Sequence, residues 1–290
     1  QLLERELDLS GIGASLARRR LRALAVTAFG YESGHAVTFY QSRAEIAPWQ
    51  RHGRVGLRTR LDFEHLLASA AIPVIFPPVK VSREYFGDGA LRQLAPISPA
   101  LHLGATRVLV LGVSGSSDSL RQQPSRPLTG KPPSLAQISG HMLNSTFIDS
   151  LEGDIELLDR INRMNRLLPA AEVTGAPGFQ SVEVLVVSPS QPLDQIAARH
   201  RRELPRALRF FLRGAGATRS SGAGVLSYLL FEAGYCNELI ELGYQDAMTQ
   251  KDKLSQFLGL ENVPPAVAAK GPAQSVAPQP VSPEPLRAGS

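Results

Sequence analysis

An aspartate held between two glycines, in Gly87-Asp88-Gly89-Ala90, is the feature that most constrains how this chain can fold. Short β-type runs precede it, and a helical pattern and the apolar run from Arg107 to Val113 follow it. A continuous apolar run of this kind is typical of a strand buried on both faces of a parallel sheet. Because glycine lets another segment or a ligand approach closely, we expect the Asp88 carboxylate to reach a neighbouring group without obstruction from its own backbone.

An ordinary hairpin turn is the alternative interpretation, since Asp-Gly is a common turn sequence. On the four residues alone, a plain turn is the better explanation. The context favours a functional role, because the small-residue run Ala68-Ser69-Ala70-Ala71 comes first, followed by Ile72-Pro73 and Phe76-Pro77-Pro78.

This order of small residues, prolines, Asp-Gly-Ala and apolar strand resembles the patatin-like phospholipases. The resemblance extends from about Leu21 to the strand that ends near Ser114, and more loosely to Met248. It implies a three-layer α/β/α fold with a mainly parallel central sheet, incomplete at its N-terminus. The alternation of predicted strands and helices independently indicates an α/β protein.

The resemblance also implies a catalytic role, because the family's DG[GA] motif carries the aspartate of a Ser–Asp dyad. It gives that role to Asp88, with Gly89 and Ala90 completing the motif. A serine hydroxyl is a weak nucleophile at neutral pH, so it needs an adjacent base and donors for the oxyanion that forms. In this family the aspartate is that base, and the substrates are lipid acyl esters.

The family's nucleophile lies in a Gly-x-Ser-x-Gly elbow, which these 290 residues do not contain. Ser33, in Gly30-Tyr31-Glu32-Ser33-Gly34, comes one position too late. Ser114 follows the apolar strand but lacks the final glycine, so a polar turn explains it better. The chain begins at Gln1 inside a helical pattern, and we expect that the serine precedes it. A Ser–His–Asp triad stays open, although nothing selects a serine for it.

Hydrophobic periodicity predicts the other elements. The strands are a hairpin over 24–41 and a second buried strand over 182–188. The helices lie over 1–20, over 61–71 with Asp62 as its capping residue, over 96–103, over 134–168 as the longest helical pattern, and near 192–202, 205–213, 222–234 and 237–258. The segment 43–60 reads as irregular. We expect a patatin-like catalytic part over 1–114, a helical and strand extension over 115–261, and a disordered Pro/Ala/Ser-rich tail over 262–290.

The net charge is +5, and two arginine clusters stand out, Arg18-Arg19-Arg20 with Arg22, and Arg199 with Arg201-Arg202. A solvated surface is the simpler explanation, and peripheral contact with an anionic membrane is the alternative. No motif indicates nucleic-acid binding. The single cysteine, Cys236, fits a reducing compartment, so we expect a cytoplasmic protein. The six histidines show no metal-ligand spacing, and we expect neither a metal nor an organic cofactor.

Two functions follow as hypotheses from different classes. The first is a serine acyl-ester hydrolase of lipids in which Asp88 is the proton acceptor and these 290 residues alone are inactive. The second is a non-catalytic lipid-binding or interaction module that keeps the patatin-like fold without the nucleophile. The sequence does not identify the ester or the oligomeric state.

Overall fold

The computed structural model describes residues 2–43, 45–73, 75–92, 96–112, 153–164, 181–204, 227 and 229–260. Within these ranges the chain is a mixed α/β protein, as the alternating pattern predicts. Its internal contacts divide it into two units, Gln1–Thr249 and Gln250–Ser290. The predicted boundaries at 114 and 261, the predicted helix over 205–213 and the predicted disordered tail lie outside the described residues, and they stay predictions.

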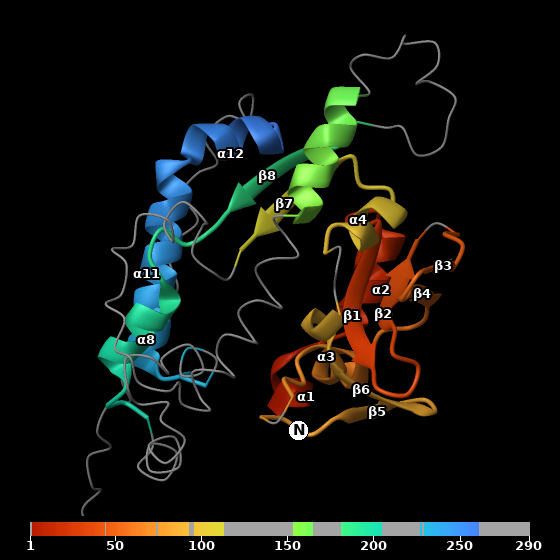
Figure 1. Ribbon diagram of the computed structural model, residues 1–290, viewed down its shortest axis with the longest axis horizontal. Helices are drawn as coiled ribbons and strands as arrows, with labels where there is room; N and C mark the ends of the chain where they lie inside the picture. Colours follow the sequence, from red (N-terminus) through yellow and green to blue (C-terminus); the bar gives the residue numbers. More distant parts are fainter. Residues whose placement is uncertain are drawn as a thin grey trace, which may run out of the picture. The chain divides into compact units, whose positions relative to one another are not determined.

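Helices and strands alternate irregularly along the described ranges (Figure 1). In chain order they are α1 (Leu2–Glu6), α2 (Ser10–Ala17), β1 (Ala23–Gly30), β2 (Ala36–Ser42), β3 (Trp49–Arg51), β4 (Arg54–Arg58), α3 (Phe63–Ser69), β5 (Val79–Val81), β6 (Glu84–Asp88), the 3-10 helix η1 (Gly89–Arg92), α4 (Ser98–His102), β7 (Arg107–Leu111), an unlabelled helix over 153–164, β8 (Glu183–Val187), α8 (Leu193–His200), α11 (Ala233–Thr249) and α12 (Lys251–Leu258).

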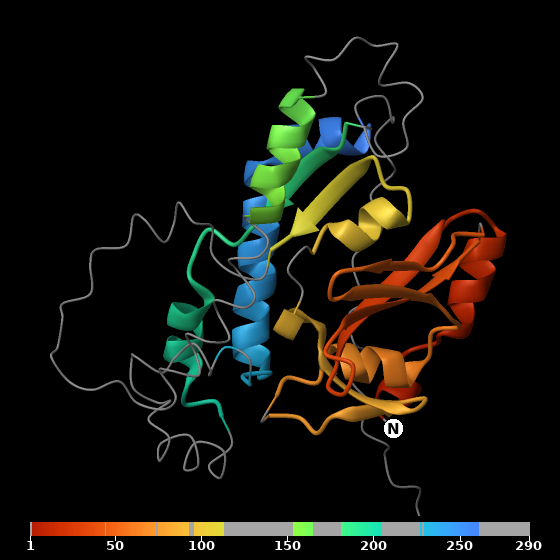
Figure 2. The same cartoon turned by 45° about the vertical axis from the view of Figure 1, so that its right-hand side comes forward.

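Six strands form one mixed sheet in the order β3-β4-β2-β1-β6-β5 (Figure 2). Only β2 and β4 pair in parallel, and the other neighbours are antiparallel. The expectation of a mainly parallel central sheet is therefore wrong for the described strands. Short connections explain the difference: only Tyr31–His35 separate β1 from β2, and only Ser82 and Arg83 separate β5 from β6. Such turns join antiparallel neighbours, whereas parallel strands need a long crossover.

Helices α2 and α3 pack against one face of this sheet. The cluster there includes Phe39 of β2, Phe86 of β6 and Ala68 of α3, with Ile12 of α2 packed on it. The prediction that Asp62 caps a helix is confirmed, since its carboxylate accepts the backbone N–H groups of Glu64 and His65. The buried His65 ring lies edge-on to Phe39, with the ring centroids 4.6 Å apart.

The opposite face carries a stack of three rings. Tyr40 follows Phe39 in β2, and successive strand residues point to opposite faces. The Tyr40 ring stacks on Trp49 of β3 at 5.0 Å, and Trp49 stacks on His102 of α4 at 4.6 Å. Helix α4 therefore contacts the face that α2 and α3 leave open. The expectation that 43–60 is irregular is wrong, because Trp49 belongs to a β3–β4 hairpin that turns through Gly53 at φ +68°.

The two apolar runs predicted as buried strands pair in parallel with each other, as β7 and β8. They form a separate two-stranded sheet, and their residues are half-buried or exposed. The helix over 153–164 is tied to this sheet by Asn162. Its side chain donates to the Val182 carbonyl (2.7 Å) and accepts the Val182 N–H (3.0 Å). The Asn162 amide thus makes the two hydrogen bonds that a neighbouring strand would make with the Val182 backbone.

Helices α8 and α11 pack through a second apolar cluster that includes Ile196, Leu204 and Tyr235. Beside it, His200 contacts two carboxylates, Glu203 Oε1 through Nδ1 and Glu238 Oε2 through Nε2, both at 2.5 Å. These bonds raise the pKa of His200, with Glu238 the larger cause. No helix in the described ranges is long and apolar enough to cross a bilayer.

Candidate functional site

Asp88 is the last residue of β6 and lies opposite Ala28 of β1 in the antiparallel ladder. Its backbone N–H donates to the Ala71 carbonyl at 2.9 Å, just beyond the end of α3. Ala68 and Ala71 are almost completely buried. Their small side chains let the end of α3 approach the strand, so the small-residue run and the Asp-Gly-Ala motif meet in one place.

A tight connection, not a hairpin turn, follows Asp88. The chain enters η1 directly at Gly89, which is buried. A Cβ atom added to Gly89 would lie 2.1 Å from the Thr27 carbonyl oxygen, far inside van der Waals contact. No strand hairpin turns at this motif, but the 3-10 helix is itself a tight turn, so the plain-turn interpretation agrees with the backbone. The need for glycine at position 89 comes from the close approach of β1.

The Asp88 carboxylate is half-buried, and its Oδ1 accepts the Ala90 N–H at 2.9 Å. Burial raises the pKa of Asp88, and the bond from Ala90 partly offsets the rise. Among the described residues no cation pairs with this carboxylate, and Oδ2 accepts no hydrogen bond. Asp88 thus combines a fixed orientation, a raised proton affinity and one oxygen open to a further donor, which are the properties of a general base.

The serine candidates near the motif do not supply a nucleophile in the described ranges. Ser33 lies in the exposed β1–β2 turn, where its N–H donates to Glu84 Oε1 (2.7 Å) and its Oγ accepts the His35 N–H (3.3 Å). Its surroundings are those of a turn-forming residue. Ser114 lies outside the described residues. Within those residues no group of three His, Cys, Asp or Glu side chains could hold a metal ion.

Asp154, in the helix over 153–164, belongs to a run of acidic residues that is typical of a solvated helix face. It is nevertheless half-buried and accepts the Ile97 N–H at 2.9 Å. Burial raises the pKa of Asp154, while this bond and the charge of Arg54 lower it. The bond joins the helix over 153–164 to the start of α4.

Asp88→Asn is expected to make the fold more stable at pH 7, by about 1 kcal/mol. Asparagine keeps the Oδ1 acceptor for Ala90 but removes a charge whose burial is unfavourable. Since the folded pKa of Asp88 is raised, the contribution of this carboxyl to the parent's stability is most favourable below its ordinary pKa and falls as pH rises from there through the folded pKa. The advantage of the variant should therefore disappear near pH 3, below the ordinary carboxyl pKa of about 3.9.

Urea unfolding at both pH values measures this difference, and Asp159→Asn is the control. Asp159 is an exposed residue of the helix over 153–164, so loss of its charge should change stability by no more than about 0.5 kcal/mol. A destabilised Asp88→Asn variant at pH 7 would show that the native carboxylate is stabilised by its surroundings, against the geometry described above.

Comparison with known proteins adds no relative: no family model, curated protein or solved structure matches this chain. The site is therefore defined by its own geometry. The sequence pointed to Asp88, Gly89 and Ala90, and the fold places them at the junction of β1, β6 and α3. The sequence does not predict that Asp88 bonds to the Ala71 carbonyl or that Gly89 lies against the Thr27 carbonyl. It shows only the small residues and glycines that make these contacts possible.

Proposed function

We propose that this chain carries the aspartate of a Ser–Asp dyad, as the Asp-Gly-Ala part of a patatin-like lipid acyl hydrolase. The observation that carries the proposal is the half-buried Asp88 carboxylate, whose Oδ1 accepts the Ala90 N–H and whose Oδ2 has no hydrogen-bond partner in the part of the chain that the structure describes. A general base acts best when its pKa lies near the working pH, and burial moves a carboxyl in that direction. The substrate would be an acyl ester of a lipid.

In the proposed reaction Asp88 Oδ2 accepts the proton of a serine hydroxyl while the serine oxygen attacks the acyl carbonyl. The alcohol leaves with that proton, and water then releases the acyl group from the serine with Asp88 again as base. The nucleophile would come from a Gly-x-Ser-x-Gly elbow, which these 290 residues do not contain. The 290-residue chain alone should therefore hydrolyse little or no ester.

The packing of the six-stranded sheet is compatible with a three-layer arrangement. Helices α2 and α3 contact the face that bears Phe39, while α4 contacts the face that bears Tyr40 through His102 and Trp49. We include the three-layer patatin-like fold in the proposal for this reason.

A non-catalytic lipid-binding module is the second candidate, favoured by the missing elbow. The coding sequence upstream of Gln1 distinguishes the two. An in-frame Gly-x-Ser-x-Gly supports the hydrolase, and a start codon close to Gln1 supports the module.

Asp88→Asn is expected to reduce ester hydrolysis about 10³-fold in the protein that includes the elbow. The fold should survive, because asparagine retains the Ala90 bond. A fluorophosphonate probe, which labels only activated serines, should mark one serine in the parent protein and lose that label in the variant. Asp159→Asn is the matched control and should hydrolyse at the parent rate. Parental hydrolysis by Asp88→Asn would exclude the dyad.

A further inference from the structure

One end of the six-stranded sheet gathers arginines from separate parts of the sequence. The register pairs Ala23 with Ser42 and Tyr40 with Arg58, so residues just before β1, just after β2 and just after β4 come together at this end. Arg43 confirms the placement, because its N–H donates to the Arg22 carbonyl at 3.0 Å. We call this group the basic edge, and it consists of Arg18, Arg19, Arg20, Arg22, Arg43 and Arg60.

The positive charge of the basic edge is not neutralised by the described residues. All six arginines are exposed, and none forms an ion pair with a carboxylate in the described ranges. Three acids lie close to these arginines in the sequence: Asp8 accepts the Ser10 N–H, Asp62 caps α3, and Glu45 pairs with Arg58 at 4.0 Å. None of the three is ion-paired with an arginine of the basic edge in the described ranges. Six neighbouring cations at one end of a sheet produce a strong field for an anionic partner.

The second arginine cluster is different, although the two look alike in the sequence. Arg199 pairs with Glu238, which also binds His200. Arg201 and Arg202 each interact with other residues as well. The sequence allowed contact with an anionic membrane at either arginine cluster. The structure supports such a contact only at the basic edge.

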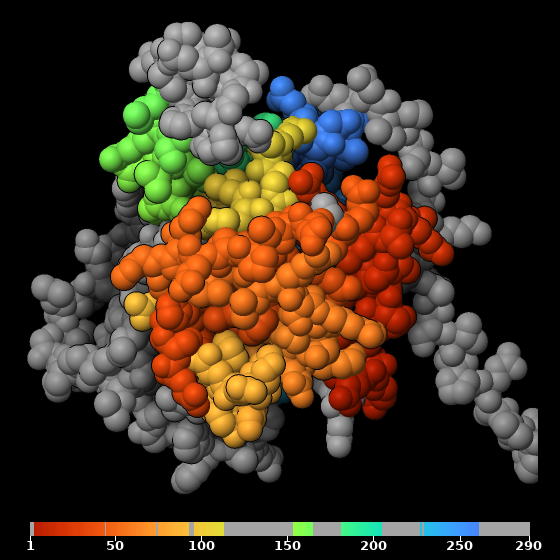
Figure 3. All heavy atoms as spheres, turned by 90° about the vertical axis from the view of Figure 1, so that its right-hand side faces the viewer, coloured from red at the N-terminus to blue at the C-terminus, as the bar shows by residue number. Residues whose placement is uncertain are grey.

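An open cleft of about 570 Å³ lies at the same end of the sheet, between α2 and the segment that leads into α3. Figure 3 shows the N-terminal helical residues beside the atoms of residues 40–65 on this side of the molecule. Leu9, Leu61 and Phe63 give the cleft apolar walls, and Gly13 leaves open space in front of its backbone. The volume is within the range of about 300–1,000 Å³ that is typical of small-molecule sites.

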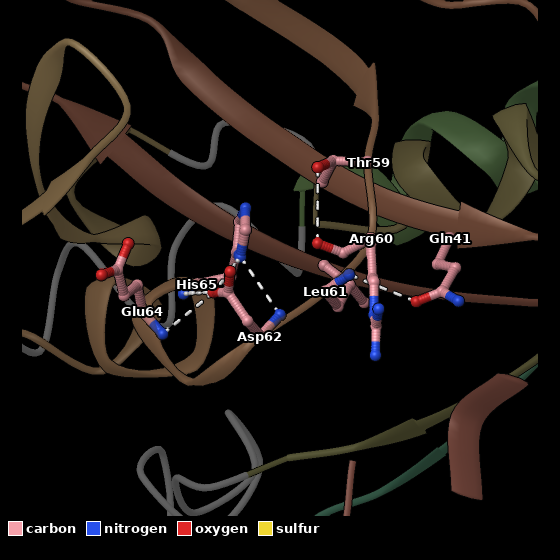
Figure 4. A network of polar contacts seen from close by, with 7 residues as sticks. All are labelled: Gln41, Thr59, Arg60, Leu61, Asp62, Glu64 and His65. Atoms are coloured by element: carbon pink, nitrogen blue, oxygen red, sulfur yellow. Dashed lines mark hydrogen bonds and ion pairs between the residues drawn. The ribbon is translucent and has the colours of Figure 1, made fainter. Parts of the chain in front are cut away.

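Arg60 lines this cleft and also belongs to the basic edge. Figure 4 shows its side chain next to the hydrogen bond that joins Gln41 to Leu61 and apart from the contact between Asp62 and His65. Gln41 Oε1 accepts the Leu61 N–H at 3.2 Å, so this polar group of the cleft is occupied. The lining is mixed, because Ser10 and the capping residue Asp62 also border the cleft. Among the described residues the Arg60 guanidinium forms no ion pair, so a cation stands beside the apolar walls, which matches an acyl chain joined to an anionic head group.

We propose that the basic edge is a docking surface for an anionic lipid bilayer, in which the acyl chain of one anionic lipid enters the cleft beside Arg60. Nucleic acid would use the arginines but not the apolar cleft. The proposal does not depend on the dyad, because Asp88 pairs with Ala28, five residues along β1 from Ala23 and about 17 Å away. Binding can therefore be tested without hydrolysis.

The test is co-sedimentation of the 290-residue chain with phosphatidylcholine vesicles that contain either no anionic lipid or about one third phosphatidylglycerol. We expect binding only to the anionic vesicles, with at least a tenfold loss between about 0.1 M and about 0.5 M salt. The triple variant Arg18→Glu/Arg20→Glu/Arg43→Glu should lose at least tenfold in binding. The matching lysine triple variant should retain binding.

A charge-matched control distinguishes the effect of the basic edge on binding from the effect of the protein's net charge. Arg51, Arg83 and Arg163 are exposed and lie outside the basic edge, and their replacement by glutamate should change binding less than twofold. The variant Gly13→Leu tests the cleft. It should weaken binding of monomeric lysophosphatidylglycerol at least fivefold. Its binding to phosphatidylglycerol vesicles should stay within twofold to threefold of the parent's. Circular dichroism confirms that each variant is folded.

Equal binding to neutral and anionic vesicles, or an equal loss in the control triple variant, would overturn the proposal. So would an oligonucleotide that binds more tightly than the vesicles and displaces them. Since none of these measurements involves ester hydrolysis, failure here leaves the Ser–Asp proposal standing, and failure of the dyad leaves this one standing.

Discussion

Gly89→Ala is expected to lower the free energy of unfolding by about 3 kcal/mol or more, the largest effect of any single methyl group in the candidate site. The added Cβ would lie 2.1 Å from the Thr27 carbonyl oxygen and 2.7 Å from its carbonyl carbon. Both atoms belong to the backbone of β1, the strand that pairs with both β2 and β6. Neither can rotate away, so the variant must separate β1 from the start of η1. Urea unfolding followed by circular dichroism measures the loss.

Gly87→Ala is the matched control, since it adds the same methyl group two residues earlier in the same motif. Its Cβ would meet the Tyr31 hydroxyl at 2.4 Å and the adjoining ring carbons Cζ and Cε2 at 2.8 and 2.9 Å, all at the far end of a residue that is 44% exposed. That ring can turn into solvent, so we expect a loss of no more than about 1 kcal/mol. Equal losses in the two variants would mean that loss of glycine flexibility, and not the contact with Thr27, decides the cost.

Sequence patterns predicted the parts of the fold whose determinants are local. The hairpin over 24–41 follows from residue alternation and the Gly30–Gly34 turn, and α3 follows from Asp62 and the proline at position 73. Strand β3 was missed because three residues with no apolar run show no period. Strand β4 was missed although Val55 and Leu57 alternate with its other residues, because its arginines and glycine make the segment read as polar. Their stability comes from pairing and from Trp49 packing over Gly56, which periodicity does not report.

The apolar runs correctly predicted that β7 and β8 are strands, but not that these strands form a sheet of their own. The pattern of β7 and β8 indicates burial but does not name the neighbours that provide it. The two strands do pair in parallel, yet in their own two-stranded sheet, where Leu111 is 71% exposed. Strand order and direction depend on contacts between distant residues, and one sequence carries no direct signal for them.

The candidate site shows the same division between local and distant information. Asp88 was identifiable because its glycines and the small residues before it are unusual together. Its raised pKa was not, since it depends on how closely β1 and the end of α3 approach. The two arginine clusters make the point more strongly, because only the fold reveals that Arg199 has a partner in Glu238 and that Arg18 has none among the described residues.

Asn162→Ala is expected to lower the free energy of unfolding by about 2–3 kcal/mol, because two backbone groups of Val182 lose their partners at once. Val182 is 7% exposed, so solvent replaces those bonds poorly. The Asn162 amide donates to the Val182 carbonyl, and its oxygen accepts from the Val182 N–H and from the Ser181 hydroxyl at 3.2 Å. Removing it should free the start of β8 from the helix over 153–164, with faster amide exchange at Val182 as the local readout.

Asn162→Asp distinguishes these bonds from simple packing. The carboxylate can still accept from the Val182 N–H but cannot donate to its carbonyl, so this isosteric variant should be destabilised at pH 7. Below a pH of about 4 the protonated carboxyl can donate again, and the stability relative to the parent should recover. Arg163→Ala, at the exposed next position, should cost no more than about 0.5 kcal/mol. An Asn162→Asp variant as stable as the parent at pH 7 would show that the bond to the Val182 carbonyl contributes nothing, and that the helix is held to β8 by other contacts.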